Sequence, residues 1–167
     1  MKRRSFLPLL TLLAAAALLA ACSLMPGPST AERHASDRHF SERGREVVIY
    51  ALSLLDTGYR FGGKNPEAGL DCSGMVAYVF AQAAGLQVSG SAADIARQGR
   101  PVDPDDLIPG DLLFFNTANR PYSHVGIFIG NGRFVHSPSA ASGHVRIDRL
   151  SNRYFSSRYH AARSYFD

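Results

Sequence analysis

The chain lacks any run of basic residues interleaved with aromatic ones, and no segment of it repeats. The first absence sets aside nucleic-acid binding. The second, together with the lack of a second linker, indicates one compact domain. Nothing in the sequence suggests a redox or nucleotide cofactor. The longest apolar run, residues 7–21, is too short and too rich in alanine for a membrane-spanning helix.

Cysteine is scarce, with only two in the chain, and the first of them ends the N-terminal segment. Basic residues at positions 2–4 precede the apolar run, which is the order of a secretory signal. The run closes with Leu-Ala-Ala-Cys at residues 19–22, which resembles a bacterial lipobox. That resemblance implies a signal peptide over residues 1–21, cleavage before Cys22 and a lipoprotein that carries diacylglycerol on the Cys22 sulfur, and palmitate. The alternative is an ordinary signal peptide with an incidental cysteine.

Acyl chains on Cys22 would hold the protein at a membrane surface without spanning it. Ser23 follows, which resembles the sorting pattern of Gram-negative outer-membrane lipoproteins, so we expect the periplasmic face of the outer membrane. Residues 22–40 then form a flexible tether, and residues 41–167 form the folded domain. Of the 18 Lys and Arg, three lie at positions 2–4, which leaves 15 against 14 Asp and Glu in a nearly neutral mature chain.

The second cysteine, Cys72, has no disulfide partner if Cys22 is acylated, and a lone thiol in an oxidising compartment indicates chemistry. The sequence places it in the first turn of a helix over residues 72–84, with Asp71 as N-cap and Gly85 as C-cap. Free N–H groups and the helix dipole there favour the nucleophilic thiolate. The alternative is a small buried hydrophobic residue.

The predicted elements change from helices to strands along the chain. Helical patterns cover residues 41–56, 72–84 and 91–98, and strand patterns cover 112–115, 124–129 and 133–137, with weaker ones at 143–147 and 160–166. This order predicts an α+β fold in which N-terminal helices pack on a central antiparallel sheet. His124 and His136 fall on two of the strands. A cysteine on a helix and histidines on strands are what a cysteine hydrolase needs.

The loop between these two strands decides whether the histidines can meet. Side chains alternate between the faces of a strand, so His124 and His136 share a face only if the loop has an odd length. A two-residue Asn131-Gly132 turn would separate them, whereas a three-residue loop from Gly130, with a left-handed Gly132, would bring them together. Asn followed by Gly permits either. We predict the three-residue loop, with Ile129 opposite Arg133 and His136 opposite Gly126.

Five motifs now occur in one order, namely Gly58-Tyr59-Arg60-Phe61-Gly62-Gly63, Asp71-Cys72-Ser73-Gly74, Pro109-Gly110-Asp111-Leu112, His124-Val125-Gly126-Ile127 and Phe134-Val135-His136. Together they resemble the NlpC family of bacterial cell-wall cysteine peptidases, over about residues 41–167. The resemblance implies a papain-like α+β fold. The chain departs from the family's commonest pattern at Phe61, where tryptophan is usual, which should alter the groove wall rather than the chemistry.

Carried over by position, the resemblance assigns Cys72 as nucleophile, His124 as general base and then acid, and His136 as the residue that orients His124. It also implies that Tyr59 helps the Cys72 N–H to stabilise the oxyanion, the alternative for Tyr59 being core packing. Gly62, Gly63 and Ser73 are candidates for contact with substrate. Further candidates for binding substrate carboxylates are Arg60, Arg97, Arg100 and Arg120.

A different interpretation makes Cys72, His124 and His136 three ligands of an open zinc site. No fourth ligand is evident, and a helix N-terminus disfavours a cation, so we expect no metal.

The resemblance also implies the substrate, the stem peptides of peptidoglycan, cut at an amide beside meso-diaminopimelate. Two bonds compete: D-Ala to diaminopimelate across a crosslink, which we favour, and D-Glu to diaminopimelate within a stem. We expect a monomer. The alternatives are a non-catalytic peptidoglycan-binding lipoprotein and a papain-like amidase or acyltransferase.

Overall fold

A computed structural model describes residues 42–141 and 143–166. The predicted signal peptide, acylated Cys22 and tether lie outside these residues, so they stay predictions. The helices are α3 (Glu42–Ser53), α4 (Cys72–Ala84), α5 (Ala92–Gln98) and α6 (Arg153–Ser156), with a 3₁₀ turn η2 (Pro104–Asp106). Within the described ranges, none of them is long and apolar enough to cross a membrane.

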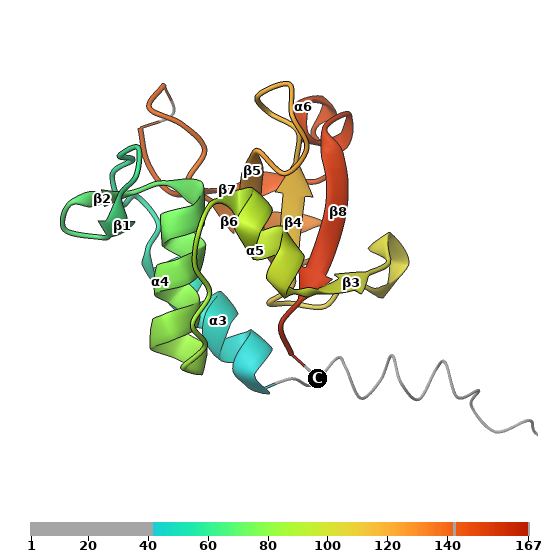
Figure 1. Cartoon of the computed structure of the whole chain (residues 1–167), viewed down its shortest axis with the longest axis horizontal. Helices are drawn as coiled ribbons and strands as arrows, with labels where there is room; N and C mark the ends of the chain where they lie inside the picture. Colours follow the sequence, from blue (N-terminus) through green and yellow to red (C-terminus); the bar gives the residue numbers. More distant parts are fainter. Residues whose placement is uncertain (1–41, 142, 167) are drawn as a thin grey trace, which may run out of the picture. The chain divides into compact units, whose positions relative to one another are not determined.

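The strands form one large antiparallel sheet and one small one. The large sheet has the order β3-β8-β4-β5-β6-β7, and the small one pairs β1 with β2 (Figure 1). The strand bounds are β1 (Lys64–Asn65), β2 (Gly69–Leu70), β3 (Arg100–Val102), β4 (Leu112–Phe115), β5 (His124–Gly130), β6 (Arg133–His136), β7 (Arg146–Arg149) and β8 (Tyr159–Ser164). Helices followed by an antiparallel sheet confirm the predicted α+β class.

Most predicted elements are confirmed to within a residue or two. The helix predicted over residues 41–56 ends at Ser53, and the strand predicted over 143–147 lies instead at Arg146–Arg149. The short strands β1, β2 and β3 and the single-turn helix α6 were not predicted, because two to four residues are too few to show a period.

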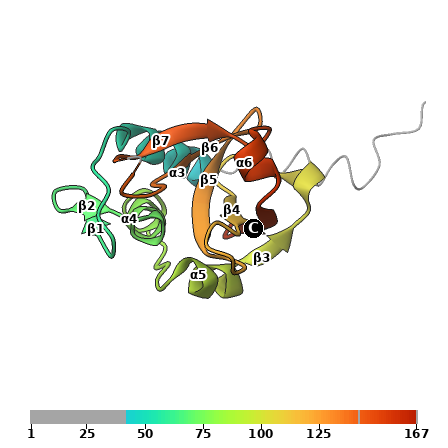
Figure 2. The ribbon, with the colours of Figure 1, turned by 90° about the horizontal axis from the view of Figure 1, so that it is seen from above.

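The central strand β4 is buried on both faces because each face of the sheet carries its own apolar layer. Leu112 and Phe114 pack in the main core with α3, α4 and α5, whereas Leu113 and Phe115 pack in a second cluster with Phe155 of α6. In the view from above, α4 and α6 lie on opposite sides of β5 (Figure 2). The two-sided burial explains why β4 reads as the continuous apolar run Leu-Leu-Phe-Phe rather than as an alternation.

The hairpin between β5 and β6 corrects the predicted loop. Gly130 pairs with Arg133, so the turn has two residues, Asn131 and Gly132, both with positive φ as a type I′ turn requires. The histidines nevertheless share a face, because the ladder shifts register between Phe128 and Gly130. The extra residue there forms a β-bulge that restores the pairing the predicted loop would have given.

Gly132→Val is expected to lower the free energy of unfolding by about 1–2 kcal/mol, because a β-branched residue resists a φ of +65°. No atom lies within 4 Å of a Cβ built at this position, so the cost is conformational rather than steric. Urea denaturation measures it, with Gly132→Asn as the matched control because asparagine tolerates positive φ. Equal stabilities of the two variants would contradict the argument.

Candidate active site

Asp71 fixes the position of Cys72 by joining the helix start to the glycine loop. One oxygen, Oδ1, accepts hydrogen bonds from the Gly74 backbone N–H at 2.7 Å and from the Ser73 hydroxyl at 3.0 Å. The other, Oδ2, accepts from the Gly62 N–H at 2.9 Å. Asp71 is therefore the predicted N-cap, and Ser73 supports the cap. Cys72 follows it as the first residue of α4 and is partly buried.

Close backbone packing explains Gly63. A Cβ on Gly63 would lie 2.2 Å from the Gly69 carbonyl oxygen, and one on Gly74 would lie 1.9 Å from the Gly63 carbonyl oxygen. The loop before Cys72 thus sits directly against α4 because neither position carries a side chain. Gly62 differs: its φ is +71° and nothing lies near its missing Cβ. It is exposed, and its role is the turn and the hydrogen bond to Asp71.

The two histidines and an aspartate form a hydrogen-bonded relay. His124 Nε2 lies 2.8 Å from His136 Nδ1, and His136 Nε2 lies 2.8 Å from Asp148 Oδ2. Both imidazoles are buried in an aromatic layer beside Phe115, Phe134 and Phe155. The structure therefore brings His124 and His136 together as predicted.

Gly126 makes the room for this contact. A Cβ on Gly126 would lie 2.7 Å from Phe134 Cδ2 and 3.2 Å from His136 Cβ, so a side chain there would push β6 away. The expected role of this glycine, space beside His124 for the second imidazole, agrees with these distances.

Asp148 sets the tautomers along the relay. Its hydrogen bond from His136, and secondarily that from Arg146, hold the pKa of its carboxyl below the usual range, so it is an acceptor only. His136 Nε2–H donates to it, which leaves His136 Nδ1 as acceptor for the Nε2–H of His124. The Nδ1 of His124 then keeps its lone pair. This is the atom that can take a proton from a nucleophile.

Burial favours the neutral forms of Cys72 and His124. It raises the pKa of the Cys72 thiol to about 11, although backbone hydrogen bonds from Val125, Ser73 and Cys72 itself oppose the rise. Burial, together with the charges of His136 and Arg146, lowers the pKa of His124 to about 3. We expected the helix start to favour the thiolate. Desolvation instead raises the pKa by more than the N–H groups lower it, and the charge of Asp71 raises it further. The resting pair is thiol and neutral imidazole.

These shifts predict that acid destabilises the fold. The unfolded chain protonates His124 near pH 6.5, whereas the folded chain keeps it neutral until about pH 3, so stability is lost as pH falls between these values. We expect a loss of about 2 kcal/mol between pH 6.5 and 4.5, with His136 contributing in the same direction because burial lowers its pKa too.

Urea unfolding at a series of pH values measures this loss. The variant His124→Gln should show a shallower dependence on pH, and the exposed His160→Gln should keep the wild-type dependence. Identical slopes for all three proteins would rule out the buried imidazole as the cause.

A cavity of about 340 Å³ opens on Cys72 and His124. Its wall also includes Tyr59, Phe61, Ser73 and Arg120. Burial raises the pKa of Tyr59, with smaller contributions from Cys72 and Asp71, so its hydroxyl stays protonated and can donate toward this space. Of the four arginines suggested by sequence, only Arg120 lines this cavity. Arg97 pairs with Asp94, and Arg100 donates to the Phe166 carbonyl at 3.0 Å.

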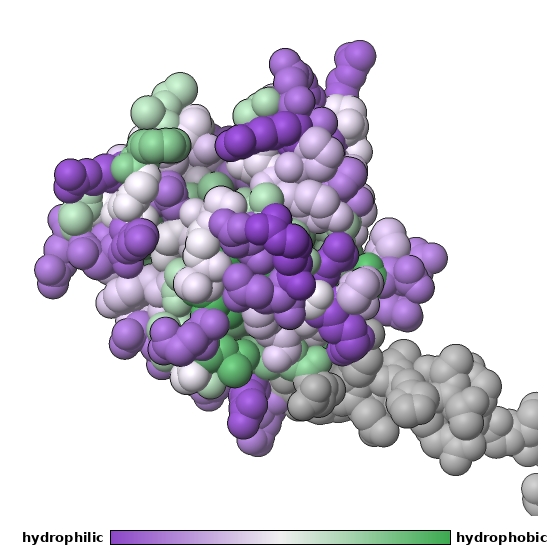
Figure 3. Space-filling model, viewed as in Figure 1, coloured by the Kyte–Doolittle hydropathy of each residue, from purple (hydrophilic) through white to green (hydrophobic). Residues whose placement is uncertain are grey.

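Apolar exposure is limited and partly concentrated at the site. The face in Figure 3 is largely polar, with apolar residues in small separate patches. The large exposed hydrophobic side chains of the described residues are Ile49, Leu52, Phe61 and Tyr154. Phe61, 89% exposed, lines the cavity at Cys72, and Tyr154 lines a second cavity beside His124.

The zinc interpretation does not fit the observed geometry. The facing nitrogens of His124 and His136 are 2.8 Å apart, which is a hydrogen-bond distance and is shorter than the separation of about 3.3 Å between two nitrogens bound at about 2.0 Å to tetrahedral zinc. Among residues 42–141 and 143–166, no three His, Cys, Asp or Glu side chains are grouped to hold a metal ion.

Sequence reasoning missed Asp148, Arg146 and Ser137. Asp148 and Arg146 lie on β7, the edge strand whose position was predicted three residues too early, and Arg146 pairs with His136 across the ladder. Arg146 Nε donates to Asp148 Oδ2 at 2.9 Å. Ser137 donates to the Leu70 carbonyl at 2.7 Å and ties the end of β6 to the segment before Cys72. The alternation of apolar and charged side chains over residues 145–149 was the sequence signal that could have located β7.

Comparison with known proteins gives consistent matches. The model of the NlpC/P60 family matches residues 56–164. Murein DD-endopeptidase MepS/Murein LD-carboxypeptidase of Escherichia coli is 34% identical over 90% of this chain and 88% of its own length. Gamma-DL-glutamyl hydrolase of Bacillus subtilis is 41% identical over 67% of this chain, and Murein DD-endopeptidase MepH of Escherichia coli is 36% identical over 67%. The chain spans only 27% and 42% of these two relatives.

Solved structures agree on the fold. The NlpC/p60 domain of peptidoglycan hydrolase SagA superimposes with a TM-score of 0.62 at 30% identity, covering 72% of this chain and 97% of that domain. An NlpC/P60 family protein from Bacillus cereus gives a TM-score of 0.69 at 28% identity, over 74% of this chain and 40% of its own. These domains are papain-like, as is the arrangement of helix, sheet and cavity described above. By sequence and by fold, the chain belongs to the NlpC/P60 family.

Proposed function

We propose that this protein is a peptidoglycan hydrolase, a cysteine endopeptidase that cuts stem-peptide amide bonds next to meso-diaminopimelate. The observation that carries the proposal is the Asp148–His136–His124 relay. It leaves the Nδ1 of His124 unprotonated, and His124 lines the same cavity as Cys72. No structural need explains two buried imidazoles oriented in this way at the edge of a cavity. A base for a nucleophile does explain them.

The reaction begins with neutral partners. The Cys72 thiol transfers its proton to His124 Nδ1 as its sulfur attacks the scissile carbonyl, so thiolate forms only during attack. The Cys72 N–H and the Tyr59 hydroxyl stabilise the oxyanion. His124 then gives its proton to the leaving amine, and an acyl-enzyme remains. Water, deprotonated by His124, releases the acyl group and restores the thiol.

The crosslink, D-Ala to diaminopimelate, is the favoured bond. Two relatives are named DD-endopeptidases, and this chain spans 88% of one of them. The D-Glu bond stands second, supported by the glutamyl hydrolase of Bacillus subtilis, of which the chain spans 27%. We further propose that lipid on Cys22 holds the enzyme at the periplasmic face of the outer membrane, where its substrate lies. The lipobox-like residues 19–22 support this placement.

Digestion of solubilised peptidoglycan by the full-length protein in detergent, followed by mass spectrometry of the muropeptides, tests the proposal. A Cys72→Ser variant is the control. Loss of crosslinked dimers with a matching gain of tetrapeptide monomers supports the favoured bond. Fragments beginning at diaminopimelate support the D-Glu bond, and tetrapeptides that lose only D-Ala indicate a carboxypeptidase. No difference from the control would favour the non-catalytic binding role. Products carrying a new acyl acceptor would indicate a transferase.

A further inference from the structure

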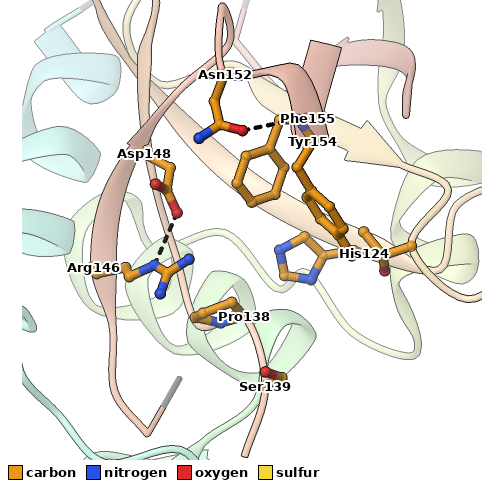
Figure 4. A pocket seen from close by; sticks show the side chains of 9 residues that line it. His124, Pro138, Ser139, Arg146, Asp148, Asn152, Tyr154 and Phe155 are labelled. Carbon is orange, nitrogen blue, oxygen red and sulfur yellow. Dashed lines mark hydrogen bonds and ion pairs between the residues drawn. The ribbon is translucent and has the colours of Figure 1, made fainter. Parts of the chain in front are cut away.

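A second cavity of about 340 Å³ lies on the other side of His124. It is bounded by the ends of β6 and β7 and by α6, and its wall includes Arg146, Asp148, Asn152 and Tyr154 (Figure 4). It shares three residues with the cavity at Cys72, namely Thr117, His124 and Pro138. The two cavities therefore adjoin at His124.

The chemistry of the proposed reaction assigns one half of the substrate to each cavity. Cys72 Sγ bonds to the acyl carbon, so the acyl half of the substrate lies over Cys72. His124 must deliver its proton to the leaving nitrogen, so the amine half lies against His124. Because the first cavity contains Cys72 and the second does not, the second cavity is the place for the amine half.

Arg146 gives the second cavity its chemical character. The side chain is half-buried, and its Nε is already bonded to Asp148 Oδ2. In Figure 4 the guanidinium lies on the cavity wall between Asp148 and Pro138, on the side that faces His124. Its two terminal nitrogens make no hydrogen bond to the residues that the structure describes, so they are free to bind a ligand. Asp148, the only carboxylate that the described residues contribute to this wall, already accepts from both His136 and Arg146.

We propose that this cavity is the subsite for the amine half of the substrate, and that the terminal nitrogens of Arg146 bind a carboxylate on the carbon next to the scissile nitrogen. A guanidinium fork matches a carboxylate in geometry and charge. The inference rests on the proposed function, and it selects between the two bonds. In a D-Ala crosslink, the leaving nitrogen sits on a diaminopimelate carbon with a free carboxylate. In the D-Glu bond of a tetrapeptide stem, the corresponding carboxyl is tied up in the amide to D-Ala.

Two synthetic crosslinked muropeptides test the subsite. They are identical except that the carboxylate beside the scissile nitrogen is free in one and a primary amide in the other. The wild-type enzyme is expected to cleave the free acid with a kcat/KM about 10- to 100-fold higher, which is the range for a charge-assisted hydrogen bond. Equal kcat/KM values for the two substrates would overturn the proposal.

Substitution of Arg146 locates the preference. Arg146→Gln should reduce the ratio of the two kcat/KM values to near one, and Arg146→Lys should keep part of it. Arg149→Gln, an exposed arginine on the same strand, should keep the wild-type ratio. If Arg146 acts only by holding Asp148, both substrates will slow together and the ratio will stay unchanged, which contradicts carboxylate binding.

A binding measurement separates failure of the subsite from failure of the function. Cys72→Ser protein is titrated by calorimetry with the amine-side product, a tetrapeptide with a free diaminopimelate amine, and with its amidated form. Tighter binding of the free acid supports the subsite even if the wild-type enzyme cleaves neither muropeptide, in which case the proposed bond is wrong. Cleavage of both muropeptides with equal binding of both products would retain the enzyme and remove the subsite.

Discussion

Cys72→Ser is expected to lower cleavage of crosslinked muropeptides by about 10⁴-fold or more, while the melting temperature stays within about 1 °C of the wild type. The serine hydroxyl holds its proton more tightly than the thiol does. The same neutral imidazole that takes the proton of the thiol would have to take the more tightly held proton of an alcohol, so attack becomes very slow.

The fold should tolerate this change because the two side chains are nearly equal in size. The Asp71 cap that begins α4 bonds to Gly74, Ser73 and Gly62, and none of its bonds depends on the sulfur. Turnover is measured by mass spectrometry of muropeptides, and stability by thermal unfolding in the same buffer. Cys72→Ala is the matched control, since it removes the nucleophile without adding a hydroxyl. Residual activity of Cys72→Ser above a few per cent would be incompatible with a cysteine nucleophile.

Truncation of the two histidines should give unequal losses. His124→Ala removes the group that accepts and returns the proton, and a loss of about 10⁴-fold in kcat/KM is expected. His136→Ala removes only the acceptor that orients His124, and a smaller loss of about 10- to 10³-fold is expected. Initial rates on a crosslinked dimer measure both. A His136 variant that is less active than the His124 variant would reverse the assigned roles.

The aspartate end of the relay allows a finer version of the same test. Arg146 Nε and His136 Nε2 both bond to Asp148 Oδ2, so an asparagine there should direct its amide oxygen to both donors. Asp148→Asn should therefore keep more activity than Asp148→Ala, although it lacks the charge. Nitrogen chemical shifts of the imidazoles report the tautomers directly. They should stay as in the wild type for asparagine and become mixed for alanine, an outcome that a purely structural role would not produce.

How much of this site was predictable differs from one element to the next. The helix at Cys72 was fully readable, because Asp71 and Gly85 are strong local signals at its two ends. The hairpin was not. Asn131-Gly132 suits two turns equally well, and the bulge between Phe128 and Gly130 reflects the pairing of the whole strand rather than any local motif. The shared face was right, but the predicted loop was wrong.

Two other features of the site, the contact of Asp148 with His136 and the protonation state of Cys72, could not be predicted from the sequence pattern. Asp148 lies on a four-residue edge strand whose weak alternation placed it only approximately, and its contact with His136 depends on the ladder register. The protonation state of Cys72 was also out of reach. A sequence shows that a thiol begins a helix, but not how deeply the neighbouring strand β5 buries it, and burial has the larger effect on its pKa.

Cys72 and His124, the proposed nucleophile and base, belong to different layers of the domain. Cys72 packs against the core shared by the helices, whereas His124 and His136 lie among the aromatic rings on the opposite face of the sheet. Their relative position therefore depends on how the helical layer packs on the sheet, and not on either element alone. Attack geometry is sensitive to displacements of about 1 Å. The buried contacts between α4 and β5, which never touch substrate, thus set the distance between Cys72 and His124.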